Sequence, residues 1–282
     1  MARSTRRPVF ARPDNRRRRR EIGLEQFALD TARRDFDTDS GAIRFGPVVA
    51  LVAAYDEEGN IGDVLKAMPD EAGGLEVTTL VVVDGGTDRT ADIAREAGVA
   101  TCVLPVNMGQ GTALKLGYEL ASEHGARYVV TLDADGQYDP GELEDILEPV
   151  LTGEADMVIA SRRLGVDQTS DRLRRAGVKV YAWAINRIIG QRLSDSSNGY
   201  RAFRIEVLDD VVPFLVQDQY QTSEVIITAA TRGWRLAQRP TVWHPRAAGA
   251  SKKGGNLFFG LQYGRVIATT WWRSRRFRVR RP

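Results

Sequence analysis

The sequence contains very little cysteine and histidine. It has one cysteine, Cys102, and two histidines, His124 and His244, among 282 residues. A single cysteine excludes an internal disulfide and suits a reducing compartment. Because apolar residues flank Cys102, we interpret it as a small buried hydrophobic residue rather than as a nucleophile.

Long apolar runs are also missing. The best candidate for a membrane span, Leu257–Trp272, contains Gln262 and Arg265 and is shorter than the roughly 20 residues that a span needs. No apolar segment follows the arginines of residues 1–20, so we expect no secretory signal peptide. These absences predict a cytoplasmic protein that meets a membrane only at its surface.

Positive charge is concentrated at the two ends of the chain, whereas the middle is acidic. Residues 1–20 carry nine arginines and one acid, and residues 273–282 carry six arginines and no acid. Residues 21–272 hold 25 basic and 36 acidic side chains, which gives a net charge of −11. An acidic body does not resemble a domain that coats nucleic acid, so we expect no nucleic-acid partner. The arginine-rich ends suit an anionic membrane surface or another polyanion.

Apolar strands alternate with helices from Pro47 onward. An unbroken apolar run such as Val48–Ala54 is typical of a strand buried on both faces of a parallel sheet. The alternation predicts an α/β fold with a doubly wound, mostly parallel sheet, whose ligands bind where the strands end. Further strands are expected at 78–83, 99–104, 128–132 and 155–160, and helices at 61–68, 87–97, 111–124 and 140–151.

Acidic and amide side chains gather at the end of the strand at 128–132. In an extended chain Asp133, Asp135 and Gln137 point to the same side. Hard cations such as Mg²⁺ or Mn²⁺ prefer these oxygen ligands, and a substrate phosphate often completes the coordination. The alternative interpretation is a solvated acidic turn, because turns also collect Asp and Gly. The other strand-end loops favour the metal site, because most of them are also polar: 55–58, 84–88, 105–110 and 161–163.

The sequence becomes more amphipathic after residue 165. It predicts a long helix at Asp171–Arg192, a loop at Asp195–Arg201, and two further helices and a strand before residue 243. The segment Leu257–Trp272 has the tryptophan and arginine content of an interfacial helix. The alternative for this segment is a core helix followed by a disordered tail.

Seven polar motifs lie between residues 54 and 252. Together and in this order they resemble the family 2 glycosyltransferases of the GT-A fold, and they look closest to the dolichol-phosphate or polyprenyl-phosphate synthases of mannose or glucose. The resemblance covers about residues 47–255. The motifs are Ala54-Tyr-Asp-Glu-Glu-Gly-Asn-Ile61, Val83-Asp-Gly-Gly-Thr-Asp-Arg-Thr90, Asn107-Met-Gly-Gln-Gly-Thr-Ala-Leu114, Asp133-Ala-Asp-Gly-Gln137, Ala160-Ser-Arg162, Asp195-Ser-Ser-Asn-Gly-Tyr-Arg201 and Arg246-Ala-Ala-Gly-Ala-Ser-Lys252.

Composition and the resemblance together divide the chain into three parts. Residues 1–46 would be a basic, largely disordered arm and linker. Residues 47–255 would form the GT-A domain, with a nucleotide-sugar half at 47–165 and an acceptor half at 166–255. Residues 256–282 would be an amphipathic membrane-interface stretch and a basic tail.

The resemblance also implies roles for single residues. Asp133, Asp135 and Gln137 would bind a divalent metal, Mg²⁺ or Mn²⁺. Asp135, Arg162 and Glu224 would be the catalytic residues. The nucleotide sugar would contact Ala53, Tyr55, Glu57, Asp84, Gly109, Asp133, Ala134, Asp135, Arg246 and Lys252. The acceptor phosphate would contact Arg162, Arg174, Arg175 and Asp195.

Some positions depart from the family pattern or allow another interpretation. Val83 replaces the first of two usual aspartates, which commonly reads the base, so the choice between a UDP- and a GDP-sugar stays open. The 84–88 stretch also suits a tight turn with a helix cap, and Asp195 also suits a role in ordering the loop that carries Arg201. Glu224 is alternatively a surface carboxylate, and the arginines of 172–175 a solvated helix start.

Three functions follow from these observations. The first is inverting, metal-dependent transfer of a hexose from a nucleoside-diphosphate sugar to a polyprenyl phosphate at the cytoplasmic membrane face. Such an enzyme would depend on a separate membrane protein for flipping or onward transfer of its product. The second is transfer to a soluble or glycan hydroxyl with Glu224 as the base. The third is a non-catalytic module that docks on membranes or nucleic acid through the arginine-rich ends.

Overall fold

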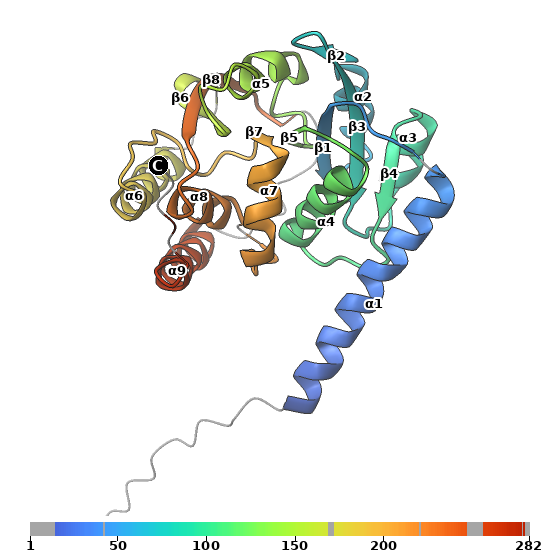
Figure 1. The fold of residues 1–282 in the computed structure, drawn as a ribbon, viewed down its shortest axis with the longest axis horizontal. Coiled ribbons are helices and arrows are strands. Elements are labelled where there is room, and N and C mark those ends of the chain that lie inside the picture. Colours follow the sequence, from blue (N-terminus) through green and yellow to red (C-terminus); the bar gives the residue numbers. More distant parts are fainter. Residues whose placement is uncertain are drawn as a thin grey trace, which may run out of the picture.

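An eight-stranded mixed sheet lies at the centre of the molecule, and helices cover both of its faces (Figure 1). The computed structural model describes residues 15–41, 43–168, 172–219, 221–246, 256–277 and 279. The sheet confirms the predicted α/β class. Its strands are β1 (Val48–Ala54), β2 (Glu71–Ala72), β3 (Leu75–Val83), β4 (Ala100–Val103), β5 (Tyr128–Asp133), β6 (Met157–Asp167), β7 (Arg201–Arg204) and β8 (Leu236–Trp243).

Strands β4, β3, β1 and β5 form the parallel half of the sheet. β1 lies between β3 and β5 and is parallel to both, and β4 is parallel to β3 on its other side. Six of the seven side chains of β1 are buried, as its unbroken apolar sequence predicts for a strand covered on both faces. All four strands therefore end at the same edge, where their polar loops begin.

Strand β7 reverses direction in the other half of the sheet. It is antiparallel to both β5 and β6, and β8 returns parallel to β6. The sequence analysis missed this four-residue strand and assigned its first residue, Arg201, to a loop. The register sets Arg201 opposite Thr131 of β5 and Ile159 of β6, so an arginine lies inside the sheet.

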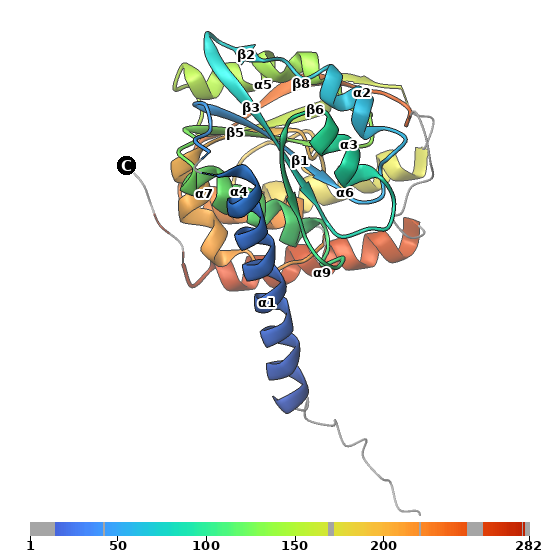
Figure 2. The same cartoon turned by 90° about the vertical axis from the view of Figure 1, so that its right-hand side faces the viewer.

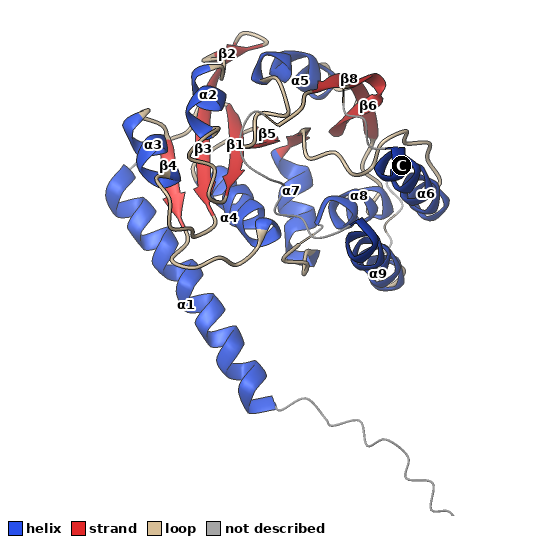
Figure 3. Cartoon of the chain, turned by 180° about the vertical axis from the view of Figure 1, so that it is seen from behind, coloured by secondary structure: helices blue, strands red, loops and turns tan. Residues whose placement is uncertain are grey.

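Two apolar cores separate the helices into layers. α4, α7 and α8 contribute to one core, together with side chains of α6 and α9, and α2 and α5 contribute to the other. α6, α8 and α9 also pack on one another (Figure 3). Within the part of the chain that the structure describes, no helix combines the length and apolar character needed to cross a membrane. The helices are α1 (Asn15–Ser40), α2 (Ile61–Lys66), α3 (Thr90–Glu96), α4 (Gln110–Glu123), α5 (Leu143–Leu151), α6 (Arg172–Ile189), α7 (Ile205–Val211), α8 (Gln221–Thr231) and α9 (Asn256–Ser274), with 3₁₀ turns at Pro140–Glu142 and Val212–Phe214.

Helix α1 differs from the disordered arm and linker that the sequence predicts for residues 1–46. Residues 15–40 are helical, and the end nearer Ser40 packs beside the edge strand β4 while the other end projects away from the body (Figure 2). Phe36 is buried between Phe45 and His124, and Arg33 forms ion pairs with Glu119 and Glu123 of α4. The helix covers a sheet edge that would otherwise be exposed. Residues 1–14 lie outside the described part of the chain.

Candidate active site at the carboxyl ends of the parallel strands

Asp84 ties the loop after β3 to the loop after β4. Its Oδ1 accepts a hydrogen bond of 2.7 Å from the backbone N–H of Met108, and its Oδ2 accepts one of 2.9 Å from Gly109. Burial raises the pKa of Asp84 to about 6, and these two hydrogen bonds partly oppose the increase. Both oxygens therefore organise the protein's own backbone.

Gly109 and Gly111 allow another loop to approach closely. Gly109 has a φ of 95°, and a Cβ there would lie 2.4 Å from the carbonyl oxygen of Asp218. A Cβ on Gly111 would lie 2.3 Å from the carbonyl oxygen of Gln217, and the Gly111 N–H donates to the Asp218 carbonyl at 2.7 Å. In the sequence, glycines here suggest a backbone approach to a diphosphate. In the structure, the backbone that they approach is the loop before α8.

Asp133 is the last residue of β5. It lies opposite Ala53 of β1, and its Oδ1 accepts a hydrogen bond of 2.7 Å from Nε2 of Gln110 at the start of α4. The sequence analysis gave Gln110 no role, although it lies inside one of the seven motifs. The contact brings the loop after β4 against the end of β5.

Asp135 and Gln137 lie close together because the chain turns between them, and not because they lie on an extended strand. β5 ends at Asp133, and Gly136 has a φ of 70°. The expectation that strand alternation places Asp133, Asp135 and Gln137 on one side is therefore wrong. Instead Oδ1 of Asp135 accepts a hydrogen bond of 3.1 Å from the N–H of Gln137, whose Nε2 donates to the carbonyl of His244.

Arg246 joins two carboxylates from different loops. Its Nη2 donates to Oδ2 of Asp135 at 2.9 Å, and its Nη1 donates to Oε1 of Glu57 at 3.0 Å. Glu57 also accepts a hydrogen bond of 2.7 Å from Nδ2 of Asn60. Three residues that the sequence assigned to the nucleotide sugar are thus in direct contact. Tyr55, two residues before Glu57, is exposed at the same strand end.

Arg162 and Asp195 form a buried bidentate ion pair. Nε of Arg162 donates to Oδ2 of Asp195 at 2.7 Å and Nη2 donates to Oδ1 at 3.0 Å. Burial works against ionisation of Asp195, but the guanidinium outweighs it and holds the pKa of this carboxyl below its usual value. Nη2 also donates to Oγ of Ser197, and the guanidinium lies over the ring of Trp243. The pair therefore fixes the 195–197 loop against β6.

Glu224 is fully buried and is not a surface carboxylate. It accepts hydrogen bonds from the backbone N–H groups of Val216 and Gln217, and it forms an ion pair with Arg273 of α9. These contacts tie α8 to α9 and to the loop before α8. The acid is thus engaged in packing, and it does not line the cavity described next.

A cavity of about 80 Å³ lies beside Asp133. It extends from the end of β5 to α8 and α9, so it connects the two halves of the molecule. The sequence assigns Tyr263 only to the amphipathic stretch, whereas in the structure it lines this cavity. The lining residues include Gln110, Thr131, Asp133, Ser197, Arg201, Gln219, Gln221, Thr222 and Tyr263.

The remaining predicted site residues lie away from these contacts or outside the described part. Ala134 has its side chain in the core beneath the sheet end. Arg174 and Arg175 lie in the first turn of α6, and their side chains are outside the described part. Lys252 also lies outside the described residues.

The donor set at the end of β5 fits a hard divalent cation. Asp133 and Asp135 offer carboxylate oxygens, and Asp135 already accepts a cationic group, the guanidinium of Arg246. In the described part of the chain no three Asp, Glu, His or Cys side chains converge. A site with two carboxylates suits Mg²⁺, which commonly takes its other ligands from water and substrate phosphates.

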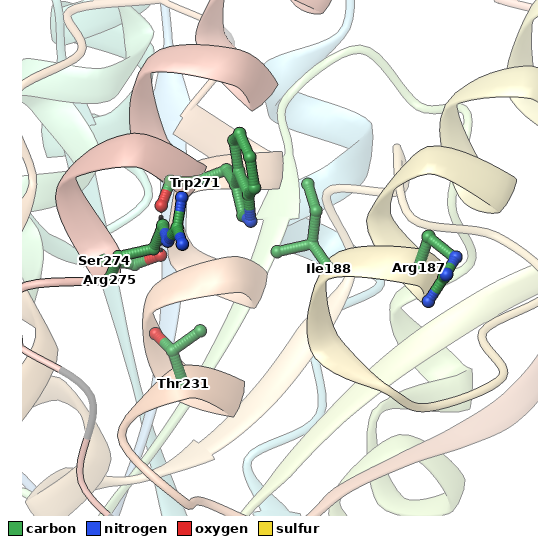
Figure 4. Close-up of a pocket in the computed structure, with 6 residues that line it drawn as sticks. All are labelled: Arg187, Ile188, Thr231, Trp271, Ser274 and Arg275. Carbon is green, nitrogen blue, oxygen red and sulfur yellow. Dashed lines mark hydrogen bonds between the residues drawn. The ribbon is translucent and has the colours of Figure 1, made fainter.

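A second hollow, of about 250 Å³, lies on the surface where α6, α8 and α9 meet (Figure 4). Trp271 of α9 and Ile188 of α6 face each other across it, with Thr231 of α8 below. Arg187 and Arg275 add positive charge, and the Arg275 guanidinium lies 5.2 Å from the Trp271 ring centroid. The lining of this hollow differs from that of the acidic strand ends, because it combines apolar and basic side chains.

Three comparisons with known proteins point to the same class of protein. The family model described as glycosyl transferase family 2 matches residues 49–212. The chain is 31% identical to a dolichyl-phosphate hexose transferase of Haloferax volcanii, over 72% of this chain and 85% of that protein. It is 29% identical to a polyprenol monophosphomannose synthase of Mycolicibacterium smegmatis, over 74% and 81%.

A solved structure shares the fold. It is glucosyl-3-phosphoglycerate synthase from Mycobacterium tuberculosis, in complex with Mn²⁺, UDP-glucose and phosphoglyceric acid. The match has a TM-score of 0.59 and 18% identity, over 86% of this chain and 82% of that chain. The likeness confirms the GT-A architecture that the sequence predicts.

Proposed function

Because the chain belongs to glycosyl transferase family 2 and is a glycosyltransferase, we propose that it transfers a hexose from a UDP- or GDP-sugar to a polyprenyl phosphate. The reaction inverts the anomeric centre and takes place at the cytoplasmic face of a membrane. The observation that carries the proposal is the contact of Asp135 and Glu57 with Arg246 at the edge where the parallel strands end. Ligands bind at this edge in open α/β sheets.

The donor half of the site consists of the loops after β1, β3, β4 and β5. Tyr55 and Glu57 face the nucleoside, with Ala53, Asp84 and Gly109 behind them. Asp133, Asp135 and Gln137 would hold Mg²⁺ or Mn²⁺, and Ala134 would contact the diphosphate. A divalent ion bound there would neutralise charge on the diphosphate leaving group. The neighbour with bound Mn²⁺ and UDP-glucose supports this arrangement by analogy of fold.

Transfer to a phosphate needs positioning more than proton removal. A phosphate oxygen of the acceptor forms a bond to the anomeric carbon, and the bond from that carbon to the diphosphate oxygen breaks with its electron pair. A phosphate monoester is already ionised near neutral pH, so no general base is required. The chain accordingly needs cations near both phosphates, and Arg246 and Lys252 serve the donor side.

The acceptor phosphate approaches from the half that contains β6, α6 and α8. Arg162 and Asp195 shape this wall through their buried ion pair, and Arg174 and Arg175 lie at the start of α6. Arginine suits the task because its planar donors match phosphate oxygens in pairs. The relatives named for dolichyl and polyprenol phosphates support a lipid acceptor.

The surface of α6 and α9 meets the membrane. Trp183, Trp271 and Trp272 are exposed there, and the hollow in Figure 4 adds Arg187 and Arg275. Tryptophan and arginine together suit the headgroup layer of an anionic leaflet. An enzyme bound in this way leaves flipping or onward transfer of its product to a membrane protein.

A panel of donors and acceptors tests the proposal. The purified chain is incubated with UDP- and GDP-hexoses, Mg²⁺ or Mn²⁺, and polyprenyl phosphate in detergent or vesicles. The expected result is a sugar-labelled product that partitions into organic solvent and forms only when metal is present. Absence of turnover or hydrolysis with every donor contradicts the proposal. Equal transfer without lipid, to a soluble acceptor, points to the hydroxyl-acceptor function instead.

A further inference from the structure

Arg201 is a buried arginine with one guanidinium nitrogen unsatisfied. The residue is 3% exposed. Its Nε donates to the carbonyl of Asn198 at 2.8 Å and its Nη1 to the carbonyl of Thr222 at 3.0 Å, whereas Nη2 is buried and makes no hydrogen bond to the residues that the structure describes. Burial lowers the pKa of Arg201. An unpaired buried donor on a charged group is costly unless something else binds it.

Comparison with Arg162 shows what Arg201 lacks. Both arginines are buried, but Arg162 has a bidentate carboxylate partner in Asp195. The hydrogen bonds of Arg201 go only to backbone carbonyls, which carry partial charge and no net charge. A buried cation is normally paired with an anion. Among the described residues no carboxylate contacts Arg201 directly, and Asp195, whose charge acts on it, is already paired with Arg162. An anionic ligand would supply the missing partner.

The unsatisfied nitrogen belongs to a residue that lines the 80 Å³ cavity. The sheet register explains its place, because β7 sets Arg201 beside Thr131, two residues before Asp133. Gln221 lines the same cavity, and its buried Oε1 likewise has no hydrogen-bond partner among the described residues. The cavity thus offers one charged donor and one acceptor to a ligand.

We propose that this cavity is the subsite for the acceptor's phosphate, with Nη2 of Arg201 donating to a phosphate oxygen. The inference rests on the proposed function and names a residue that it did not include. Charge distinguishes phosphate from a sugar hydroxyl, because only an anion compensates the buried guanidinium. Oε1 of Gln221 would accept a hydrogen bond from the hydroxyl of a singly protonated phosphate.

The other walls set the orientation of the acceptor. Asp133 lines the donor end of the cavity and its negative charge disfavours an anion there, so the phosphate is confined to the Arg201 end. Tyr263 of α9 lines the cavity, and α9 also carries the exposed Trp271 and Trp272. A lipid phosphate on Arg201 would thus lie between the donor and the helix that meets the membrane.

Binding of short phosphates in the absence of donor tests the inference. The probes are inorganic phosphate and citronellyl phosphate, titrated calorimetrically into the full chain. Arg201→Gln is expected to weaken binding about 10- to 100-fold, because it removes a charge-assisted hydrogen bond. Arg204→Gln is the matched control, since Arg204 lies on the same strand and pairs with Asp156 and Glu206 outside the cavity. It should bind as the wild type does.

A second variant keeps the test decisive if Arg201→Gln does not fold. Gln219 lines the cavity but is exposed, so Gln219→Glu adds a negative charge without disturbing the core. It should weaken phosphate binding several-fold and raise KM for polyprenyl phosphate, with KM for the donor unchanged. Failure of the wild type to bind either phosphate would show that the cavity holds only water and would overturn the inference.

Two further outcomes separate this inference from the proposed function. If the wild type makes lipid-linked sugar but Arg201→Gln and Gln219→Glu keep its acceptor KM, the subsite is wrong and the function stands. If Arg201→Gln raises only the donor KM, the cavity holds the hexose and the inference is again wrong. If the wild type transfers no sugar to lipid phosphate, the function fails, while the calorimetric result still decides whether the cavity binds phosphate.

Discussion

Arg246 donates a hydrogen bond of 2.9 Å from Nη2 to Oδ2 of Asp135, although the two residues are 111 positions apart. The contact connects the turn after β5 with the segment after β8. It places a cation against the carboxylate that we propose as a metal ligand, so a divalent ion would share this acid with Arg246. Arg246 also pairs with Glu57, so the two carboxylates share one cation.

Asp135→Asn should abolish metal-dependent binding of the nucleotide sugar. The change removes the negative charge and keeps the size, so transfer should fall by about 100-fold or more. Titration of UDP and GDP with and without Mn²⁺, together with initial rates, measures the effect. Asp63→Asn, on the exposed surface of α2, is the control. Unchanged metal-dependent binding in Asp135→Asn would contradict the assignment.

Asp84→Asn should change how stability depends on pH. The pKa of Asp84 is about 6 in the folded chain, above its ordinary value of 3.8, so the folded state binds more protons between these values. The stabilisation of the folded state by protonated Asp84 is therefore fully present below pH 4 and is lost as the pH rises through 6. The advantage of the wild type over Asp84→Asn in unfolding free energy should shrink by about 2 kcal/mol between pH 4 and pH 7.

Urea unfolding at several pH values measures this difference for Asp84. Asp92→Asn provides the comparison, because Asp92 is an exposed carboxylate in α3. Parallel stability curves for the wild type and Asp84→Asn would show that Asp84 does not titrate differently in the folded chain.

Glu224→Gln should loosen α9 without removing a catalytic base. The acid holds Arg273 and two backbone N–H groups, so losing its charge should cost about 2 kcal/mol of unfolding free energy. Proteolysis should cut α9 faster, while the transfer rate per folded molecule stays within about threefold at low temperature. Glu206→Gln, on α7, is the control. Unchanged stability with complete loss of transfer would instead make Glu224 a base.

Phe36→Ala should show that α1 belongs to the folded domain. Phe36 is 2% exposed, and its removal should cost about 3–4 kcal/mol of unfolding free energy. Phe27→Ala on the same helix is the matched control, because Phe27 is 66% exposed and its loss should change stability by less than about 0.5 kcal/mol. Equal midpoints of urea unfolding for the two variants would mean that α1 does not contribute to the core.

The parallel half of the fold could be predicted from the sequence because the signals for its strands are local. The run Val48–Ala54 is apolar throughout, and polar turn residues follow it directly, so both the strand and its end are readable. β7 gave no such signal, because two of its four residues are arginines and strands of this length have no clear period. The sequence signal for α1 is weak because only a narrow strip with Ala28, Ala32 and Phe36 is buried, while other apolar residues of the helix, Leu24 and Phe27, are exposed.

The candidate site was predictable as a set of loops, but the partners within it were not. Motif order located Asp84, Asp133, Asp135 and Arg246, since each follows a strand. Which carboxylate meets which donor depends on packing between distant segments, such as Asp84 with the Met108 backbone and Glu224 with Arg273. Arg201 ends one of the seven motifs, but its position beside the cavity depends on strand β7, which the sequence did not predict.

The central claim is that the acceptor nucleophile is a phosphate, and one comparison of acceptors tests it most directly. Initial rates of hexose transfer are measured with a polyprenyl phosphate and with the matching polyprenol, which has the same chain and a free hydroxyl. We predict an organic-soluble sugar product with the phosphate and none above background with the alcohol, because arginines lie at the proposed acceptor site and the candidate base Glu224 is engaged by Arg273 and two backbone N–H groups. Transfer to the polyprenol at a comparable rate would contradict the account.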